Sequence, residues 1–526
     1  MTPSGPSALL EIADSVGWEA STAKERTGRG LEGQFFTSAS IARFLAAWFG
    51  EAGLDRASLH LLDPGAGGGA LTAALVERIA GLRKAGRLRK VEAITLEAWE
   101  TDQSFLPVLE QSLSACAGAL AAVGVRANVK LNSASYVEGA VRALDAGLFE
   151  AREAPSVTHA ILNPPYCKIS TGSEERALMR AVGIETTNLY AAFVWLALRQ
   201  LATGGELAAI TPRSFCNGPY FREFRRELHT SASLRHIHLF DSRREAFGRD
   251  EVLQENVLFH LTRGGDKAAT VTISTGSLQS PIKVAIPADR LIRPDDADKV
   301  IHIATDRDAN EIRDFMVSLP CRLEELAVEV STGPVVDFRL KDSLSLRLRE
   351  NHVPLLYPHC VRVGRVSPPL DDASGYSDRR IGKKPVAIAV NDETRRWLVP
   401  AAGFVLIKRF SSKEERRRLV AGVLDPSEFP EGPLGIENHL NFFHRRRAGL
   451  PAGLANGLCR FLNSSVADRY FRQFNGHTQV NATDLRAFRY PNAATLEKLG
   501  TTSLDDTDQA AIDLAMTTLL GAPSLA

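Results

Sequence analysis

The 526 residues of this chain include 63 Lys and Arg against 62 Asp and Glu, and 44% of the residues are hydrophobic. Such a composition is typical of a soluble globular protein, and the length exceeds one ordinary domain, so we expect two or three. No apolar run reaches the roughly 18 residues of a transmembrane helix. The N-terminus lacks the basic and apolar segments of a signal peptide. We therefore expect a cytoplasmic protein without a membrane anchor.

The cysteines give no sign of a metal site or a disulfide framework. Six of them, at positions 116, 167, 216, 321, 360 and 459, are scattered singly, without CxxC or Cys/His ligand spacing. Such cysteines fit reduced thiols of a cytoplasmic protein. We expect no bound metal.

Charge is distributed unevenly along the chain, although the net charge is only +1. Residues 321–500 contain 28 Lys and Arg against 20 Asp and Glu, whereas the remainder contains 35 against 42. A basic half beside an acidic half is what a polyanion-binding domain joined to an enzyme would produce. A solvated basic surface is the alternative.

The first predicted elements surround two loops. After a helical stretch within residues 1–30, GQFFTS (33–38) precedes the helical spacing of SIARFLAAWF, with Ser38 or Ser40 as N-cap. A strand at 59–62 then runs into DPGAGGG (63–69) and a helix at 70–82. A strand, a glycine-rich turn and a helix form the first unit of a Rossmann-like nucleotide site. The spacing is neither the dinucleotide GxGxxG nor a P-loop.

The next elements continue the alternation. A strand at 93–99 ends at Glu100, where a carboxylate is placed to hold two ribose hydroxyls. A helix at 104–120 and strands at 127–131 and 157–162 follow. This alternation predicts a parallel sheet covered on both faces.

Asn163-Pro164-Pro165-Tyr166 follows the last of these strands. The two prolines fix φ and push Asn163 away from helical geometry, so the motif forms a rigid lip at the strand's carboxyl end. Open α/β sheets bind ligands at that edge. An amide oxygen and a proline carbonyl can accept both hydrogens of a planar amino group, while the tyrosine stacks on the ring that carries it. A strand-ending turn with a structural aromatic is the alternative.

Beyond this motif we expect a polar, mobile segment at 173–183, a buried helix at 191–201 and a strand at 206–212. Strands at 234–240 and 255–263 close the sheet, which places the first domain at 1–265. The second domain, 266–526, begins with short strands at 270–276, 282–287 and 299–305 and a helix at 309–319. It ends in a helical module at 457–491 and a terminal helix.

In their order and spacing, GQFFTS, DPGAGGG, the strand ending at Glu100, NPPY and the long C-terminal half resemble the gamma-class, TaqI-like adenine-N6 DNA methyltransferases of type II restriction–modification systems. The resemblance covers the whole chain. It implies an α/β fold with a Rossmann-like, S-adenosylmethionine-dependent methyltransferase domain and a C-terminal mixed α+β target-recognition domain. The implied reaction methylates N6 of an adenine flipped out of duplex DNA and protects that DNA from a cognate restriction endonuclease.

The resemblance also assigns residues. It implies cofactor contacts for Gln34, Phe35, Phe36, Thr37, Asp63, Gly65, Ala66, Gly67, Glu100, Thr101, Asn163 and Phe193. It implies catalytic roles for Asn163, Pro164, Pro165, Tyr166 and Phe247, with Phe247 stacking on the base opposite Tyr166. The chain departs from the family pattern at Ser38, which replaces a proline, and at Ser135-Tyr136, which replace an Asp-Phe pair that reads the cofactor adenine.

The C-terminal module resembles target-recognition domains of the PstI/BsuBI kind. His477, Gln479, Asn481 and Thr483 are candidate base contacts, because Asn and Gln can read adenine bidentately. Arg416 and Arg445, each in a run of arginines, are candidate phosphate contacts. An ordinary turn is the alternative for the former group.

No carboxylate–carboxylate–Lys constellation is evident downstream, so we expect the cleaving enzyme to be a separate protein. We expect this chain to act as a monomer or a dimer. A methylase of RNA or of a protein glutamine side chain, a DNA-recognition subunit without transfer activity, and cytosine-N4 as the acceptor remain alternatives.

Overall fold

The computed structural model describes residues 9–10, 37–145, 156–240, 255–264, 267–303, 307–369, 384–411, 415–475 and 478–524. The chain divides into two compact units, Met1–Thr305 and Asp306–Ala526. The domain boundary that we predicted, between 265 and 266, falls inside unit 1.

Unit 1 is built on one nine-stranded sheet of order β3-β2-β1-β4-β5-β7-β6-β8-β9. Its strands are β1 Ser58–Pro64, β2 Ala93–Trp99, β3 Arg126–Asn132, β4 Val157–Leu162, β5 Leu201–Pro212, β6 Ala232–Leu239, β7 Asn256–Arg263, β8 Thr270–Thr275 and β9 Ile282–Pro287. From β3 to β5 every pairing is parallel, as predicted. Beyond β5 the sheet is mixed, because β7 runs antiparallel to both β5 and β6.

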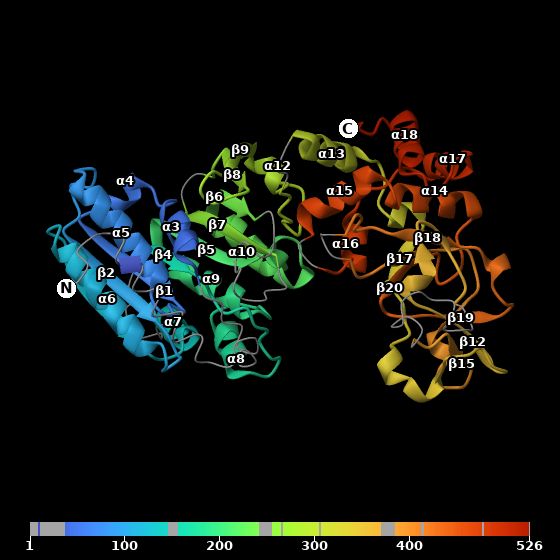
Figure 1. Cartoon of the computed structure of the whole chain (residues 1–526), viewed down its shortest axis with the longest axis horizontal. Coiled ribbons are helices and arrows are strands. Elements are labelled where there is room, and N and C mark those ends of the chain that lie inside the picture. Colours follow the sequence, from blue (N-terminus) through green and yellow to red (C-terminus); the bar gives the residue numbers. More distant parts are fainter. Residues whose placement is uncertain are drawn as a thin grey trace. The chain divides into compact units, whose positions relative to one another are not determined.

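The helices of unit 1 form two groups (Figure 1). They are α3 Ala39–Ala46, α4 Glu51–Leu54, α5 Ala70–Lys84, α6 Leu106–Ala121, α7 Tyr136–Leu144, α8 Glu174–Ala181, α9 Leu189–Gln200, α10 Arg222–Ser231 and α12 Ala288–Leu291. Helix α5 packs against α3 and α6, whereas α9 packs against α7 and α10. The connections from β1 to β3 and those from β3 to β5 run in opposite directions along the sheet, so right-handed crossovers place these groups on opposite faces.

Three local predictions have clear outcomes. Ser38 caps α3, since its side chain accepts a hydrogen bond from the Ile41 amide, as expected. Residues 173–183, predicted as a mobile segment, contain α8, which Ser173 caps through the Arg176 amide. The strand predicted at 299–305 is wrong over its described part, where Ile301 forms only an isolated bridge to Ile292.

Unit 2 contains two further sheets, of order β10-β20-β17-β18-β14-β13 and β11-β15-β12-β19-β16. The strands are β10 Glu329–Thr332, β11 Leu344–Ser345, β12 His352–Leu356, β13 Val361–Arg362, β14 Gly364–Val366, β15 Ala387–Ala389, β16 Leu398–Pro400, β17 Phe404–Lys408, β18 Ala421–Leu424, β19 Pro433–Ile436 and β20 Leu440–His444. The helices are α13 Arg307–Ser318, α14 Ala452–Leu462, α15 Ser465–Phe474, α16 Ala482–Ala487, α17 Ala493–Thr501 and α18 Gln509–Leu520. This is the mixed α+β composition that we predicted.

The six cysteines are free, and none forms a disulfide bond. Within the described ranges, no helix is long and apolar enough to span a membrane. The same ranges contain no group of three or more His, Cys, Asp or Glu side chains arranged to hold a metal ion.

Candidate active site

The predicted site residues converge where β1 and β4 end. These strands are parallel neighbours, and the chain leaves β1 toward β2 but leaves β4 toward β5. Such a reversal opens a crevice at the carboxyl edge of a sheet. A Cβ atom on Gly65 would lie 3.6 Å from Phe193 Cε1, 3.8 Å from Pro165 Cδ and 3.9 Å from the Asn163 carbonyl oxygen. The glycine loop, the NPPY motif and Phe193 therefore adjoin one another.

The glycine loop is shaped by the end of β2. Gly65, Gly67 and Gly69 all have positive φ, at 75°, 53° and 82°, a region that other residues rarely adopt. The amides of Gly65 and Ala66 both donate to the Trp99 carbonyl oxygen, at 2.8 and 2.9 Å. These bonds hold the loop close to the β2 carboxyl end, where Glu100 follows.

Glu100 is only 7% exposed, and its carboxylate joins the loop to the residues behind it. Oε2 accepts from the Gly67 amide at 2.9 Å and Oε1 from the Asp102 amide at 2.8 Å. A carboxylate offers about four lone-pair positions, so both oxygens retain capacity for a further donor. Burial raises the pKa of Glu100 despite these two bonds. Thr101 beside it is exposed.

Asp63 is the most deeply buried acid of the site. Its Oδ2 accepts from the Thr72 amide at 3.2 Å and from the Thr72 hydroxyl at 2.7 Å. Its Oδ1 is buried and has no hydrogen-bond partner in the described chain. Burial, with a smaller contribution from the Glu100 charge, raises the pKa of Asp63 to about 7. A buried, half-satisfied carboxyl group suits a cationic ligand, which would offset its desolvation.

Asn163 is oriented by Thr37, which lies just before α3. Its Nδ2 donates to the Thr37 hydroxyl at 3.0 Å, which brings the last residue of the GQFFT motif to NPPY. With Nδ2 directed at Thr37, Oδ1 is the acceptor end of the amide. Pro164 is buried, and Tyr166 is half-buried with its ring edge-on to Tyr190 at 6.3 Å. Gln34, Phe35 and Phe36 lie outside the described residues.

Phe193 belongs to an aromatic group beside the glycine loop. Phe193, on α9, is 7% exposed, and its ring centroid is 5.0 Å from that of Tyr136. The Tyr136 ring also contacts Trp99, and its hydroxyl donates to Gln200. Tyr136 is therefore a packing residue behind Phe193, while Ser135 caps α7 through the Glu138 amide. Ser135 and Tyr136, which depart from the family pattern, therefore both have roles in the fold.

Phe247 lies outside the described residues. It belongs to the connection between β6, which ends at Leu239, and β7, which begins at Asn256. Asn256 pairs with Pro212 at the end of β5, so both ends of the connection are at the carboxyl edge.

Two residues of this region were missed in the sequence. Thr72 donates to one of the two carboxylate oxygens of Asp63. A hydroxyl residue in the first turn of a helix that follows an acidic strand end could have indicated this contact. Tyr190 supports Tyr166 and stacks on Phe221, and its hydroxyl pairs with Ser214. It stood three residues before Phe193 in the segment that we had singled out.

The candidate DNA contacts differ in how they are engaged. Arg416 is exposed, whereas its neighbours Arg417 and Arg418 point into unit 2. Arg418 is 1% exposed and donates to Ser411 and Asn475. Asn481 forms a capping box with Asp484 at the start of α16. Gln479 is half-buried, and His477 is outside the described residues.

Arg445 opens a tight turn at the end of β20. Its guanidinium donates to the Leu326 carbonyl oxygen at 3.2 Å and is half-buried. Two backbone bonds between Arg445 and Ala448 close the turn. The tip residues, Arg446 and Arg447, are exposed and have φ of 48° and 63°.

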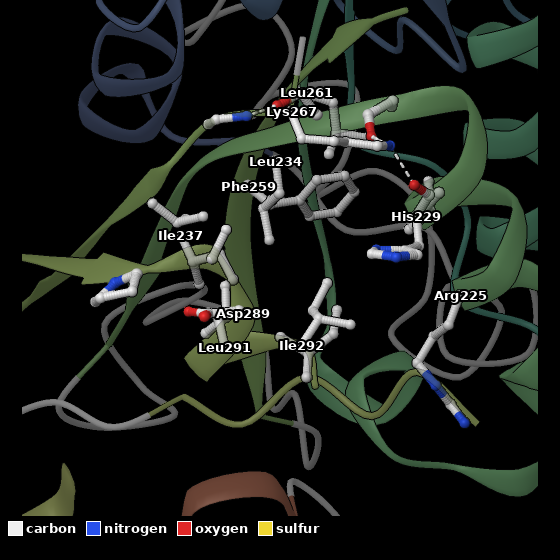
Figure 2. A pocket seen from close by; sticks show the side chains of 18 of the residues that line it. Arg225, His229, Leu234, Ile237, Phe259, Leu261, Lys267, Asp289, Leu291 and Ile292 are labelled. Carbon is white, nitrogen blue, oxygen red and sulfur yellow. Dashed lines mark hydrogen bonds between the residues drawn. The ribbon is translucent and has the colours of Figure 1, made fainter. Parts of the chain in front are cut away.

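A cavity of about 520 Å³ lies elsewhere in unit 1, among β6, β7, β8, α10 and α12 (Figure 2). Its wall is mainly apolar and includes Leu234, Phe259 and Leu291. Its cations are engaged within the fold: Lys267 Nζ donates to carbonyl oxygens at the end of α10, and Arg225 donates to those of Phe215 and Gly218. The site residues predicted from the sequence are not among those lining this cavity.

The Rossmann-like sheet, the glycine loop with its buried acids and the adjoining NPPY lip together define a methyltransferase. Residues 159–247, which include that lip, match the Eco57I restriction-modification methylase family. The chain is 39% identical over 497 residues to the type II methyltransferase M.PstI of Providencia stuartii, with 94% of each chain covered. It is 41% identical over 495 residues to the type II methyltransferase M.BsuBI of Bacillus subtilis, which covers 93% of this chain and 94% of that one. This chain belongs to their family, the type II methyltransferases of restriction–modification systems.

Among solved structures, the type IIL restriction-modification enzyme MmeI in complex with DNA aligns with 97% of this chain and 74% of its own, at 11% identity and a TM-score of 0.48.

Proposed function

We propose that this protein transfers a methyl group from S-adenosylmethionine to the N6 amine of an adenine that is flipped out of duplex DNA. The observation that carries the proposal is the position of Asn163. Asn163 lies at the carboxyl edge, beside the glycine loop. Its Nδ2 donates to the Thr37 hydroxyl, so Oδ1 is the acceptor end of the side-chain amide. An amine acceptor and a methyl donor could therefore meet at this one point.

The residues around the glycine loop fit S-adenosylmethionine. The unpartnered Oδ1 of Asp63 suits the cofactor's cationic end, and the remaining lone pairs of Glu100 suit its ribose hydroxyls. Phe193 offers a face for the adenine ring. The bound cofactor would supply a methyl group activated by its sulfonium. The protein's task is then to bind and orient the two reactants.

Asn163 and Pro164 would act on the amine. The nitrogen lone pair of an exocyclic amine is delocalised into the ring, which makes it a weak nucleophile. Two acceptors, Asn163 Oδ1 and the Pro164 carbonyl, would hold both N–H groups and favour a pyramidal nitrogen whose lone pair points at the methyl group. Such catalysis rests on position and electrostatics, and it requires no covalent enzyme intermediate.

The base must leave the helix before it can reach these groups. Tyr166, supported edge-on by Tyr190, would stack on one face of the extruded adenine. We propose Phe247 for the other face, because the connection that contains it begins and ends at the same edge of the sheet. Stacking on aromatic side chains offsets part of the unstacking cost.

The two alternative methylases are less well supported. Methylases of RNA or of protein glutamine that carry NPPY tend to lack a long C-terminal half, whereas unit 2 extends from Asp306 to Ala526. The curated relatives match over both units. We propose unit 2 as the DNA-recognition domain, with duplex DNA and a separate endonuclease acting on the same site as partners.

Single-molecule methylation sequencing of DNA from cells that express the protein tests the proposal. We expect N6-methyladenine at one defined sequence, and no such mark in cells that express the Asn163→Ala variant at the same level. A mark on cytosine N4, or the absence of any mark with the wild-type protein, would contradict it.

A further inference from the structure

We infer that Gln479, together with His439 and Phe410, forms a surface of unit 2 that reads base edges of the target duplex. The inference rests on the proposed role of unit 2 in binding DNA, and it goes further by naming the reading residues. The three residues come from three different parts of the sequence, and Phe410, just after β17, contacts both His439, just before β20, and Gln479.

The backbone at Gln479 is fixed from several directions. Gln479 forms an isolated antiparallel bridge with Phe410, so the two side chains lie on the same face. Two hydrogen bonds flank the pair, Ser411 N to Thr478 O at 2.9 Å and Val480 N to Arg409 O at 2.7 Å. The amides of the buried Asn441 and Asn475 donate to the carbonyl oxygens of Val480 and Gln479. A side chain mounted on such a backbone is held in a defined position.

The side-chain amide of Gln479, by contrast, makes no hydrogen bond with the described residues. It offers one donor group and one acceptor side by side, and this is the pattern that matches N7 and N6 of adenine in the major groove. Asn481, two residues on, is unavailable for the same purpose because it caps α16. We therefore assign base reading in this segment to Gln479.

His439 is held beside this surface by a carboxylate with no solvent exposure. Glu437 accepts from the His439 amide at 2.8 Å and pairs with ring Nδ1 at 2.5 Å. The Glu437 side chain is 0% exposed, whereas the His439 side chain is 44% exposed. Burying a carboxylate is costly, and the buried Glu437 carboxylate makes both of these hydrogen bonds to His439, whose side chain is exposed. The arrangement fixes the ring and leaves Nε2 for an external partner.

Phe410 completes the surface. It is 39% exposed, its ring centroid is 4.8 Å from that of His439, and the Arg409 guanidinium lies 5.8 Å from its centre. An exposed aromatic ring beside a cation and two polar groups suits apolar contact with a thymine methyl group and attraction to the phosphate backbone.

A binding assay can test the assignment without any methyl transfer. Enrichment of a random duplex library by the wild-type protein defines the recognised sequence, whichever atom is methylated. Fluorescence anisotropy then gives the affinity for that duplex and for duplexes with each base pair changed in turn. We expect Gln479→Ala to lose about 10- to 100-fold of the discrimination at one adenine position, as expected for a bidentate pair.

The same variant should bind DNA that lacks the site, and S-adenosylmethionine, within about twofold of wild type. His439→Ala should reduce discrimination at a neighbouring position. Gln111→Ala, at an exposed glutamine of α6 in unit 1, is the matched control and should change nothing. Equal weakening on every duplex would show a phosphate contact and would overturn the inference, as would wild-type discrimination by Gln479→Ala. Failure of the adenine methylation proposal would leave these measurements intact.

Discussion

Replacing Asp63 with Asn should stabilise the protein and weaken its cofactor binding at the same time. Asparagine has the same shape, so its oxygen can keep the two bonds from Thr72. The substitution removes a buried negative charge, and it places an amide nitrogen where the wild-type carboxylate has an oxygen without a partner.

The magnitude follows from the pKa. Asp63 titrates near 3.8 when unfolded and at about 7 in the folded protein. Its folded pKa is raised, so its ionisation destabilises the fold as pH rises from about 4 to about 7. At roughly 1.4 kcal/mol per pKa unit, the cost is about 2 kcal/mol at pH 5 and about 4 kcal/mol at pH 8. Asp63→Asn lacks this cost, so its advantage in unfolding free energy should widen between these two pH values.

Urea unfolding followed by tryptophan fluorescence measures this difference in unit 1, which contains four of the five tryptophans. Calorimetry of the same two proteins gives the second half of the prediction. Wild-type affinity for S-adenosylmethionine should strengthen relative to the variant as pH rises through 7, because the ionised Asp63 attracts the cationic end. The titration of the cofactor's own amino group is common to both proteins and cancels in the ratio. A variant that is equally stabilised at pH 5 and pH 8, or destabilised at pH 8, would refute the reasoning.

Three further substitutions test separate roles in the proposed site. Asn163→Ala should nearly abolish methylation, while calorimetry shows that S-adenosylmethionine binding is largely intact. Near-wild-type turnover would contradict the role of Asn163 in holding the target amine. Tyr166→Ala should lose about 1–3 kcal/mol of base stacking, and unchanged fluorescence of a 2-aminopurine placed at the target would count against it. Glu100→Ala should raise the dissociation constant for S-adenosylmethionine more than that for DNA, and the reverse pattern would contradict a ribose contact.

The catalytic part of the fold was predictable because its signals are local. Each of β1 and β4 is a short apolar run that ends in residues with an obvious backbone preference, the glycine loop after β1 and the double proline after β4. Parallel strands that end together must bring those loops together, and Gly65, Pro165 and Phe193 do adjoin.

Long-range pairing decided what the sequence left open. β8 and β9 are alternating runs that would suit any sheet, and only the pairing of β8 with β6 assigns them to unit 1. The sequence of the arginine run 416–418 shows its charge but not which side chains face solvent. Arg418 turns out to be buried, where it donates to Asn475. Asn481 and Gln479 are similar in chemistry, yet the capping box that engages Asn481 became evident only when the start of α16 was known.

The turn at Arg446 and Arg447 has a conformation that costs the protein stability. Positive φ at both tip positions is the geometry of a type I′ turn, for which Asn-Gly is the preferred sequence. A left-handed conformation costs an ordinary residue about 1–2 kcal/mol, so a more stable hairpin was two substitutions away. In this chain the two tip positions are occupied by exposed arginines instead. An Asn-Gly replacement should therefore stabilise the hairpin while it removes both positive charges from the turn.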